Sequence, residues 1–118
     1  HAEKGEALLK EMVSMDEGAG KLGEVALIPY DSPINNSGVL FYNTLFDENA
    51  SCHLAVGHGF NECLKGYEKY TDEECKARGI NDSMIHVDFM IGAKDMSIVG
   101  VTFSGERVQI FKDGNWAF

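Results

Sequence analysis

Residues 84–93 read MIHVDFMIGA, an apolar run that holds one imidazole and one carboxylate two positions apart. A short apolar run that ends at glycine predicts a buried β-strand. Successive side chains of a strand point to opposite faces, so His86 and Asp88 share one face while Val87 and Phe89 occupy the other. A carboxylate in this setting must be exposed to water, ion-paired, hydrogen-bonded or bound to a cation.

The segments after this run predict a C-terminal β-meander. SIVGVTF (97–103) and RVQIF (107–111) are β-prone. A turn is expected between them at 104–106, and a second turn at Asp113-Gly114.

The segments before the run predict further elements of both kinds. Residues 3–15 carry apolar side chains at helical spacing and predict an amphipathic helix that covers one sheet face. Residues 22–30 (LGEVALIPY) predict a short strand, whereas DENASCHLAVG (47–57) is compatible with a helix or a strand. Thr71, three residues before Glu74, predicts a helix N-cap. The fold class expected is α+β: a mixed or antiparallel sheet, an N-terminal amphipathic helix and a C-terminal β-meander.

The overall composition limits the possible partners. The 118 residues fit one domain, 1–118, and 19 acidic against 10 basic side chains give a net charge of −9. This charge disfavours nucleic acid as a partner. No stretch is apolar enough to cross a membrane, and three cysteines at irregular spacing predict reduced thiols. We expect a soluble, cytoplasmic protein.

Four polar residues in apolar surroundings are candidate metal ligands: Glu24, His53, His86 and Asp88. Two carboxylates and two imidazoles suit zinc, cobalt or manganese. The alternative for the H-x-D pair is an edge strand whose polar face meets water. His58, in the glycine-rich GHGF segment, is expected to be a loop residue and not a ligand.

Three motifs in a fixed order make the pattern more specific. They are GEVALIPYDSPI (23–34), TLFDENASCHLAVG (44–57) and IHVDFMIGA (85–93). Together they resemble the carboxy-terminal part of the thermophilic-type metalloaminopeptidases, the M29 peptidase family, from about Gly18 to the end of the chain.

The resemblance implies a catalytic-domain fragment of a larger, two-domain enzyme that releases N-terminal amino acids from peptides. It implies two divalent metal ions (Zn, Co or Mn), a water activated between them, and a homodimer as the full-length protein. Glu24, His53, His86 and Asp88 fall on family metal-binding positions, and Glu24 is the candidate catalytic base or ligand. Asp47 or Glu48 is a candidate to orient His53 through its second ring nitrogen.

Two departures from the family define the alternatives. A further metal-binding glutamate of the family has no match in residues 1–23, so the isolated fragment is expected to be inactive. Phe60 stands where family members usually carry a tyrosine. The alternatives are therefore a non-catalytic metal-binding or assembly module, and an interaction domain that binds no metal and uses its acidic surface to bind a basic partner.

Overall fold

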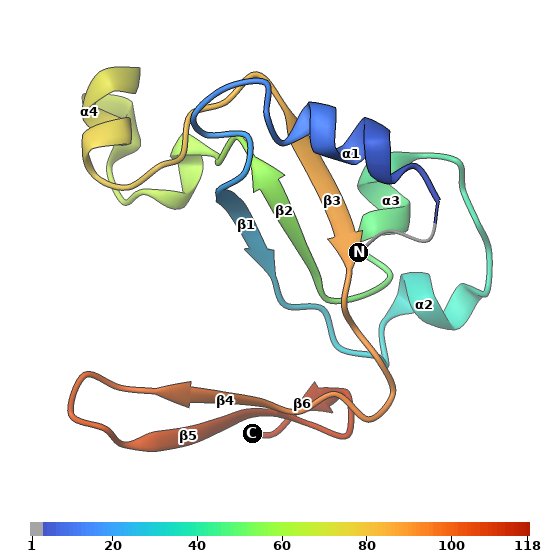
Figure 1. Cartoon of the computed structure of the whole chain (residues 1–118). Coiled ribbons are helices and arrows are strands. Elements are labelled where there is room, and N and C mark those ends of the chain that lie inside the picture. The colour runs from blue at the N-terminus through green and yellow to red at the C-terminus, as the bar shows by residue number, and fades with distance from the viewer. Residues whose placement is uncertain (1–3) are drawn as a thin grey trace. The chain divides into compact units, whose positions relative to one another are not determined.

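A computed structural model describes residues 4–118 and divides them into two compact units (Figure 1). The first unit contains residues 4–25 and 54–88, and the second contains residues 26–53 and 89–118. The elements, in chain order, are α1 (Glu6–Met12), β1 (Leu22–Ala26), α2 (Pro33–Ser37), α3 (Thr44–Glu48), β2 (His53–Gly57), η1 (Asn61–Cys63), η2 (Tyr67–Lys69), α4 (Asp72–Ala77), β3 (His86–Met90), β4 (Ile98–Val101), β5 (Arg107–Lys112) and β6 (Asn115–Trp116).

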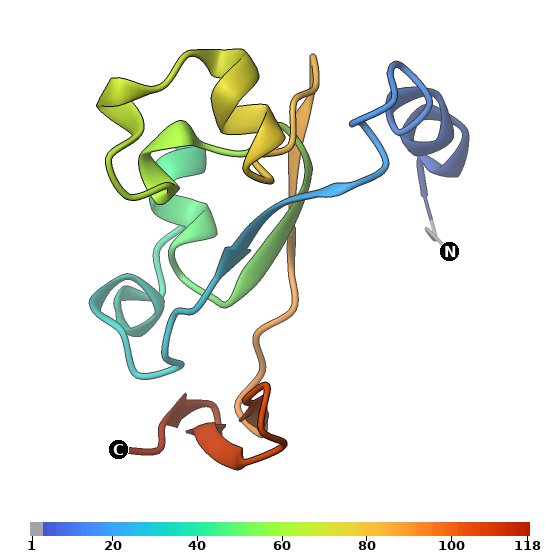
Figure 2. The same ribbon diagram turned by 90° about the vertical axis from the view of Figure 1, so that its left-hand side faces the viewer.

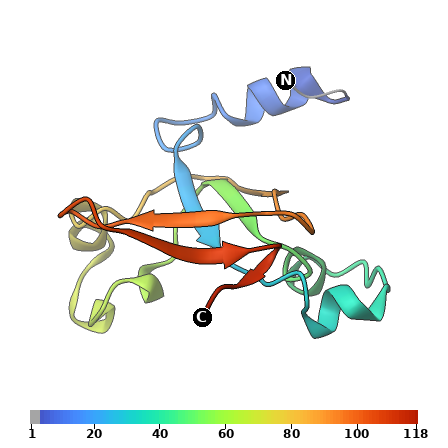
Figure 3. The same ribbon diagram turned by 90° about the horizontal axis from the view of Figure 1, so that it is seen from below.

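The predicted α+β class is confirmed by two three-stranded sheets, ordered β1-β2-β3 and β4-β5-β6. In the first sheet, neighbouring strands run in opposite directions and β2 is central (Figure 1). In the first unit, α1 lies on one side of the strands and the segment from η1 to α4 lies on the other (Figures 2 and 3). The prediction that residues 1–118 form a single domain remains a prediction.

The N-terminal helix α1 is shorter than the predicted span of 3–15, of which residue 3 lies outside the described part of the chain. It begins after Gly5, which has the left-handed φ of 72°. An ion pair between Lys10 and Glu6, 2.8 Å apart, supports it from the surface. None of its residues is buried, and Leu8 is 61 % exposed. The helix therefore does not bury an apolar face against the sheet as the spacing predicts.

Asp16 fixes the segment that leads into β3. Its Oδ2 accepts hydrogen bonds from the Met84 amide (2.8 Å) and the Ser83 hydroxyl (3.0 Å), and its Oδ1 accepts one from the Gly18 amide (2.8 Å). These donors, the Met84 amide foremost, hold the pKa of Asp16 below its usual value, although burial opposes them. The charged carboxylate is thus the form that stabilises the fold.

Asp16→Asn is expected to lower the melting temperature most at neutral pH. Because the pKa is lower in the folded state, the carboxylate stabilises the fold above its unfolded value near 3.8. That stabilisation disappears as the pH falls through the lower, folded value. Thermal melts from pH 7 to pH 2 should therefore show the difference from the parent chain shrinking in acid. Asp82→Asn, which removes an exposed ion pair with Lys76 and a 3.8 Å contact with the ring of His58, is the control. A difference independent of pH would contradict this account.

The helix α4 begins at the predicted N-cap. The Thr71 hydroxyl accepts a hydrogen bond from the Glu74 amide (3.3 Å), and the Glu74 carboxylate accepts one from the Thr71 amide (2.8 Å). This reciprocal pair is a capping box. It confirms the prediction drawn from the spacing of Thr71 and Glu74.

The second unit contains two short helices that the sequence did not predict. The PINNS segment forms α2, because Ser32 accepts a hydrogen bond from the Asn35 amide (3.3 Å) and Pro33 takes the first helical position. Asn43 caps α3 in the same way. The undecided segment 47–57 divides into the end of α3 and the strand β2.

The predicted β-meander is confirmed as β4, β5 and β6, whose neighbouring strands pair antiparallel (Figure 3). Asp113 and Gly114 make the tight turn between β5 and β6, both with positive φ (50° and 74°). Phe111 is fully buried and its ring meets Trp116 edge-on at 4.4 Å. Phe111 is thus the buried residue of the meander, and Trp116, which is 43 % exposed, packs against its ring.

Two further predictions concern the thiols and the membrane. Cys52, Cys63 and Cys75 are all free, as predicted. Within residues 4–118, no helix has both the length and the apolar character needed to span a bilayer.

Candidate metal centre

Three of the four predicted ligands meet in the first unit. Glu24 comes from β1, whereas His86 and Asp88 come from β3. The His86 Nε2 atom lies 3.4 Å from Oε2 of Glu24 and 3.3 Å from Oδ1 of Asp88. All three ligand atoms fall within 4.8 Å of one another. The side chains are only partly exposed, from 13 % for Asp88 to 26 % for Glu24, so the group forms a semi-enclosed cluster.

The cluster requires side chains to reach over the central strand. Two strand spacings, about 9.6 Å, separate β1 from β3. Side chains of Glu24 and His86 can therefore meet only where the central strand has small residues between them. Two residues of β2, Ala55 and Gly57, have little or no side chain, and both are buried. The small side chain of Ala55 is compatible with this approach, whereas a Cβ atom at Gly57 would overlap the backbone of Ile85 and not a residue of the cluster.

The orientation of His86 is set by a backbone carbonyl. Its Nδ1 atom lies 2.7 Å from the carbonyl oxygen of His58. A carbonyl oxygen can only accept, so Nδ1 carries the hydrogen and Nε2 of the neutral ring carries a lone pair. The lone pair faces the carboxylates of Glu24 and Asp88. This is the arrangement found at metal-ligating histidines.

The cluster fits a divalent cation. Oδ1 of Asp88 is buried, and no described group donates a hydrogen bond to it. It lies beside the lone pair of His86 and the carboxylate of Glu24, so three electron-rich atoms face one another in a partly exposed cluster. A cation among them satisfies all three atoms at once, and oxygen with imidazole nitrogen suits zinc, cobalt or manganese.

His53, the fourth predicted ligand, belongs to the second unit. It is the first residue of β2 and is 1 % exposed. Its Nδ1 atom lies 2.9 Å from the carbonyl oxygen of Ser51, which leaves Nε2 as the lone-pair nitrogen. His53 therefore carries its hydrogen on the same ring nitrogen, Nδ1, as His86. Its place in the ligand set remains a prediction.

The expected partners of His53, Asp47 and Glu48, lie in different surroundings. The Nδ1 atom of His53 contacts the Ser51 carbonyl, and a carboxylate oxygen of Glu48 lies within 4.8 Å of a ring nitrogen of His53, so the orienting role of a carboxylate remains a prediction. The Asp47 carboxylate instead accepts hydrogen bonds from the amides of Phe41 (2.8 Å) and Asn43 (3.1 Å). Asp47 thus holds the loop before α3. Phe41 and Asn43 precede it by only six and four residues, so its carboxylate oxygens can reach their amides.

Two contributions to the cluster were not expected from the sequence. His58 is a loop residue, as predicted, yet its backbone carbonyl orients His86. The Phe60 ring packs against the His86 ring, with centroids 5.0 Å apart. The role of a backbone carbonyl cannot be predicted from the type of residue that carries it. The two glycines that flank His58 nevertheless indicate a place where two backbone segments approach closely.

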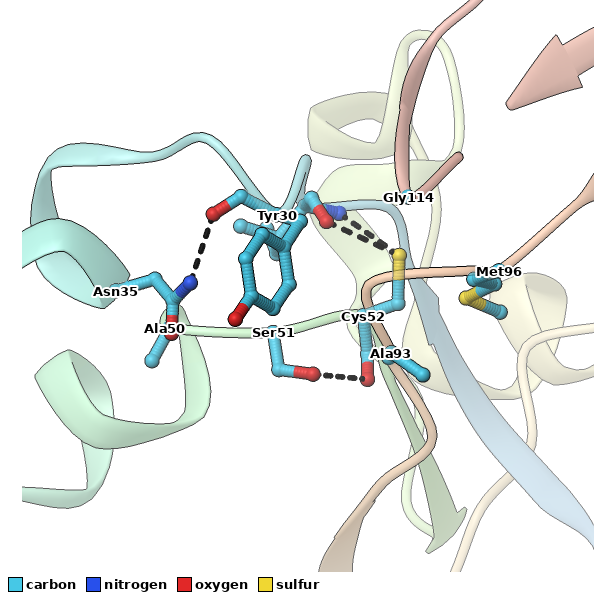
Figure 4. A pocket seen from close by; sticks show the side chains of 10 residues that line it. Tyr30, Asn35, Ala50, Ser51, Cys52, Ala93, Met96 and Gly114 are labelled. Carbon is cyan, nitrogen blue, oxygen red and sulfur yellow. Dashed lines mark hydrogen bonds between the residues drawn. The ribbon is translucent and has the colours of Figure 1, made fainter. Parts of the chain in front are cut away.

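The second unit contains a pocket of about 240 Å³ around Cys52 (Figure 4). The Cys52 sulfur accepts a hydrogen bond from the Ile28 amide (3.3 Å) and donates one to the Ile28 carbonyl (3.2 Å). Asn35 donates to the Tyr30 carbonyl (2.8 Å). Among residues 4–118, no carboxylate, imidazole or amine lines this pocket, and its one thiol, Cys52, is hydrogen-bonded to the Ile28 backbone.

Comparisons with known proteins agree with the chemistry of the cluster. Residues 1–116 match the family described as thermophilic metalloprotease (M29). Aminopeptidase AmpS of Bacillus subtilis is 59 % identical over 117 residues, and Aminopeptidase 2 of Geobacillus stearothermophilus is 52 % identical over 117 residues. Each alignment covers 99 % of this chain and 28 % of the relative.

A solved structure gives the same result for the fold. Wild-type AmpT from Thermus thermophilus matches with a TM-score of 0.85 at 44 % identity. The match covers 100 % of this chain and 28 % of the AmpT chain. The present chain therefore spans little more than a quarter of the length of these relatives.

Proposed function

Because the chain belongs to the thermophilic metalloprotease (M29) family, we propose that its protein is a metal-dependent aminopeptidase that releases N-terminal amino acids from peptides. The single observation that carries this proposal is the cluster of Glu24, His86 and Asp88, in which a buried carboxylate oxygen and an imidazole lone pair converge. The names of the relatives, all aminopeptidases, support the same reaction and a substrate with a free N-terminus.

Each residue of the cluster has a proposed role. His86 and Asp88 hold a metal ion, His53 is a further ligand, and Glu24 is either a ligand or the general base. The ligand set belongs to a pair of divalent ions, zinc, cobalt or manganese. Bound divalent ions supply Lewis acidity that polarises the scissile carbonyl and promotes deprotonation of the attacking water.

Glu24 can move the proton that hydrolysis requires. Its side chain is 26 % exposed, so one side of the carboxylate is open to water while Oε2 faces His86. A carboxylate at such a position can take a proton from the attacking water and pass it to the leaving amine. Cleavage breaks the peptide C–N bond and forms the new C–O bond, and the transferred proton leaves on the amine.

Glu24→Gln tests this role in the full-length protein. If Glu24 is the base, kcat for leucine p-nitroanilide should fall by about 100-fold or more while the metal content is unchanged. If it is a ligand, activity and bound metal should be lost together. Metal analysis and steady-state kinetics on the same sample separate the two roles. Glu11→Gln, an exposed carboxylate on α1, is the control. Unchanged hydrolysis in Glu24→Gln would contradict both roles.

Phe60 favours a second candidate function, a metal-binding or assembly module without catalysis. Its ring lies against His86 and supplies no hydroxyl there. This candidate predicts one tightly held ion and no peptide hydrolysis by the full-length protein. Hydrolysis that is lost in Glu24→Gln would exclude it. Homodimer formation and the cytoplasmic compartment remain predictions from the family resemblance and the sequence.

A further inference from the structure

We propose that Asn81 is a positioning residue for the metal ligand His86, acting through the backbone of the GHG segment, residues 57–59. The inference rests on the proposed function, because it concerns how His86 is presented to a metal ion. Asn81 does not touch Glu24, His86 or Asp88 in any described hydrogen bond or ion pair.

Asn81 holds the GHG segment on both sides of His58. Its side-chain amide donates hydrogen bonds to the carbonyl of Gly57 (2.5 Å) and to the carbonyl of Gly18 (2.9 Å). Its own backbone carbonyl accepts a hydrogen bond from the Gly59 amide (2.8 Å). One residue thus fixes the peptide before His58 and the peptide after it, and ties them to the segment before β1 through Gly18.

The rest of the segment leaves His58 little freedom to move. The His58 amide donates to the Ile85 carbonyl at 2.6 Å, directly before β3. Gly57 has a φ of 101°, and a Cβ atom at this position would overlap the backbone of Ile85. A Cβ atom at Gly23 would overlap the carbonyl of His58. Backbone atoms therefore enclose the carbonyl of His58. The side chain of Asn81 holds the neighbouring peptide in place through its hydrogen bond to the Gly57 carbonyl.

This arrangement determines which nitrogen His86 presents. The His58 carbonyl holds the hydrogen on Nδ1 of His86 and keeps Nε2 directed at Glu24 and Asp88. Partners of this kind fix the tautomer and ring orientation of metal ligands. If the amide of Asn81 is lost, the GHG segment loses the hydrogen bond at Gly57 and its link to Gly18, and the His58 carbonyl is free to turn away from His86.

Two variants of the full-length protein test the proposal. Asn81→Asp keeps the shape but replaces the donating amide with a carboxylate that faces two carbonyl oxygens. Asn81→Ala removes the donor without adding charge, and decides the question if Asn81→Asp does not fold. Asn61→Asp is the matched control, because Asn61 makes an exposed hydrogen bond to Asp72 in the same unit. Zinc affinity is measured by competition with a chelator. In the metal-free protein, the tautomer of His86 is read from imidazole ¹⁵N shifts.

We expect zinc affinity to fall about 10- to 100-fold in both Asn81 variants, the usual effect of losing an outer partner of a ligand. The Nδ1–H form of His86 should lose population in the metal-free protein, and Asn61→Asp should change neither quantity. A lower melting temperature with unchanged zinc affinity and tautomer would mean that Asn81 is only structural, and would overturn the inference while the proposed function stands. A parent protein that binds no divalent metal would overturn both.

Discussion

Replacing Asp88 with asparagine is expected to abolish metal binding and at the same time to stabilise the metal-free protein. The carboxylate oxygen Oδ1 is buried, receives no hydrogen bond and lies 3.3 Å from Nε2 of His86. An asparagine amide placed there could donate to that lone pair, which relieves an unsatisfied group at a gain of about 1 kcal/mol. The same change removes the anionic ligand, so metal affinity should fall by more than about 100-fold.

The opposite signs of these two effects make the prediction specific. Thermal unfolding with excess chelator should show a higher melting temperature for Asp88→Asn than for the parent. Added zinc should raise the melting temperature of the parent only, because a ligand stabilises only a folded state that binds it. Aminopeptidase activity should disappear with the metal. Asp95→Asn, at an exposed position of the second unit, is the control. Equal stabilisation of both proteins by zinc would show that Asp88 is not a ligand.

The second large effect is expected from Gly23→Ala, in the strand that carries Glu24. A Cβ atom at Gly23 would overlap the backbone carbonyls of Gly57 and His58. Neither carbonyl is the end of a flexible side chain, so the strands β1 and β2 must move apart. We expect a loss of about 3 kcal/mol in the free energy of unfolding, the upper part of the usual range for overpacking. The His58 carbonyl should also move away from His86, so zinc affinity should fall even in the protein that still folds.

Gly20→Ala is the matched control for this substitution. A Cβ atom at Gly20 would meet its nearest neighbour, the Val13 carbonyl, at 3.4 Å, and the backbone there has no left-handed φ. Denaturant unfolding should therefore give a near-parental free energy for Gly20→Ala and a much lower one for Gly23→Ala. Equal free energies for the two variants would mean that the close approach of β1 and β2 is not required.

Periodicity and local chemistry were sufficient to predict part of this molecule. The alternation in MIHVDFMIGA places His86 and Asp88 on one face of a strand, and β3 spans His86–Met90. The Asp113-Gly114 pair makes the expected turn. The capping box of α4 follows from the spacing of Thr71 and Glu74 alone. These features depend on neighbours within a few residues, which is why the sequence reveals them.

The features that the sequence did not reveal depend on distant contacts or on competing local signals. Asn81 contacts the backbone of Gly57 and Gly59, which lie more than 20 residues earlier in the chain. No spacing or residue type in the sequence predicts these contacts. The apolar stripe of α1 predicted burial, but in the described part of the chain nothing covers it. The short helix α2 was not predicted, because Pro33 and the two asparagines that follow are also typical of a turn.

The two sheets differ in how much chain separates their strands, and this difference sets the order in which they can form. The strands β4, β5 and β6 follow one another through short turns, whereas β1 joins β2 only after residues 27–52, and β2 joins β3 only after residues 58–85. Closing a long loop lowers the conformational entropy of the chain before stabilising contacts can form. Structures rich in local contacts therefore form faster. During refolding, the meander should appear first and the cluster of Glu24, His86 and Asp88 last. In stopped-flow refolding, zinc binding should therefore develop more slowly than the fluorescence change of Trp116. A newly made chain would then pass through an intermediate in which the meander is formed but zinc is not yet bound.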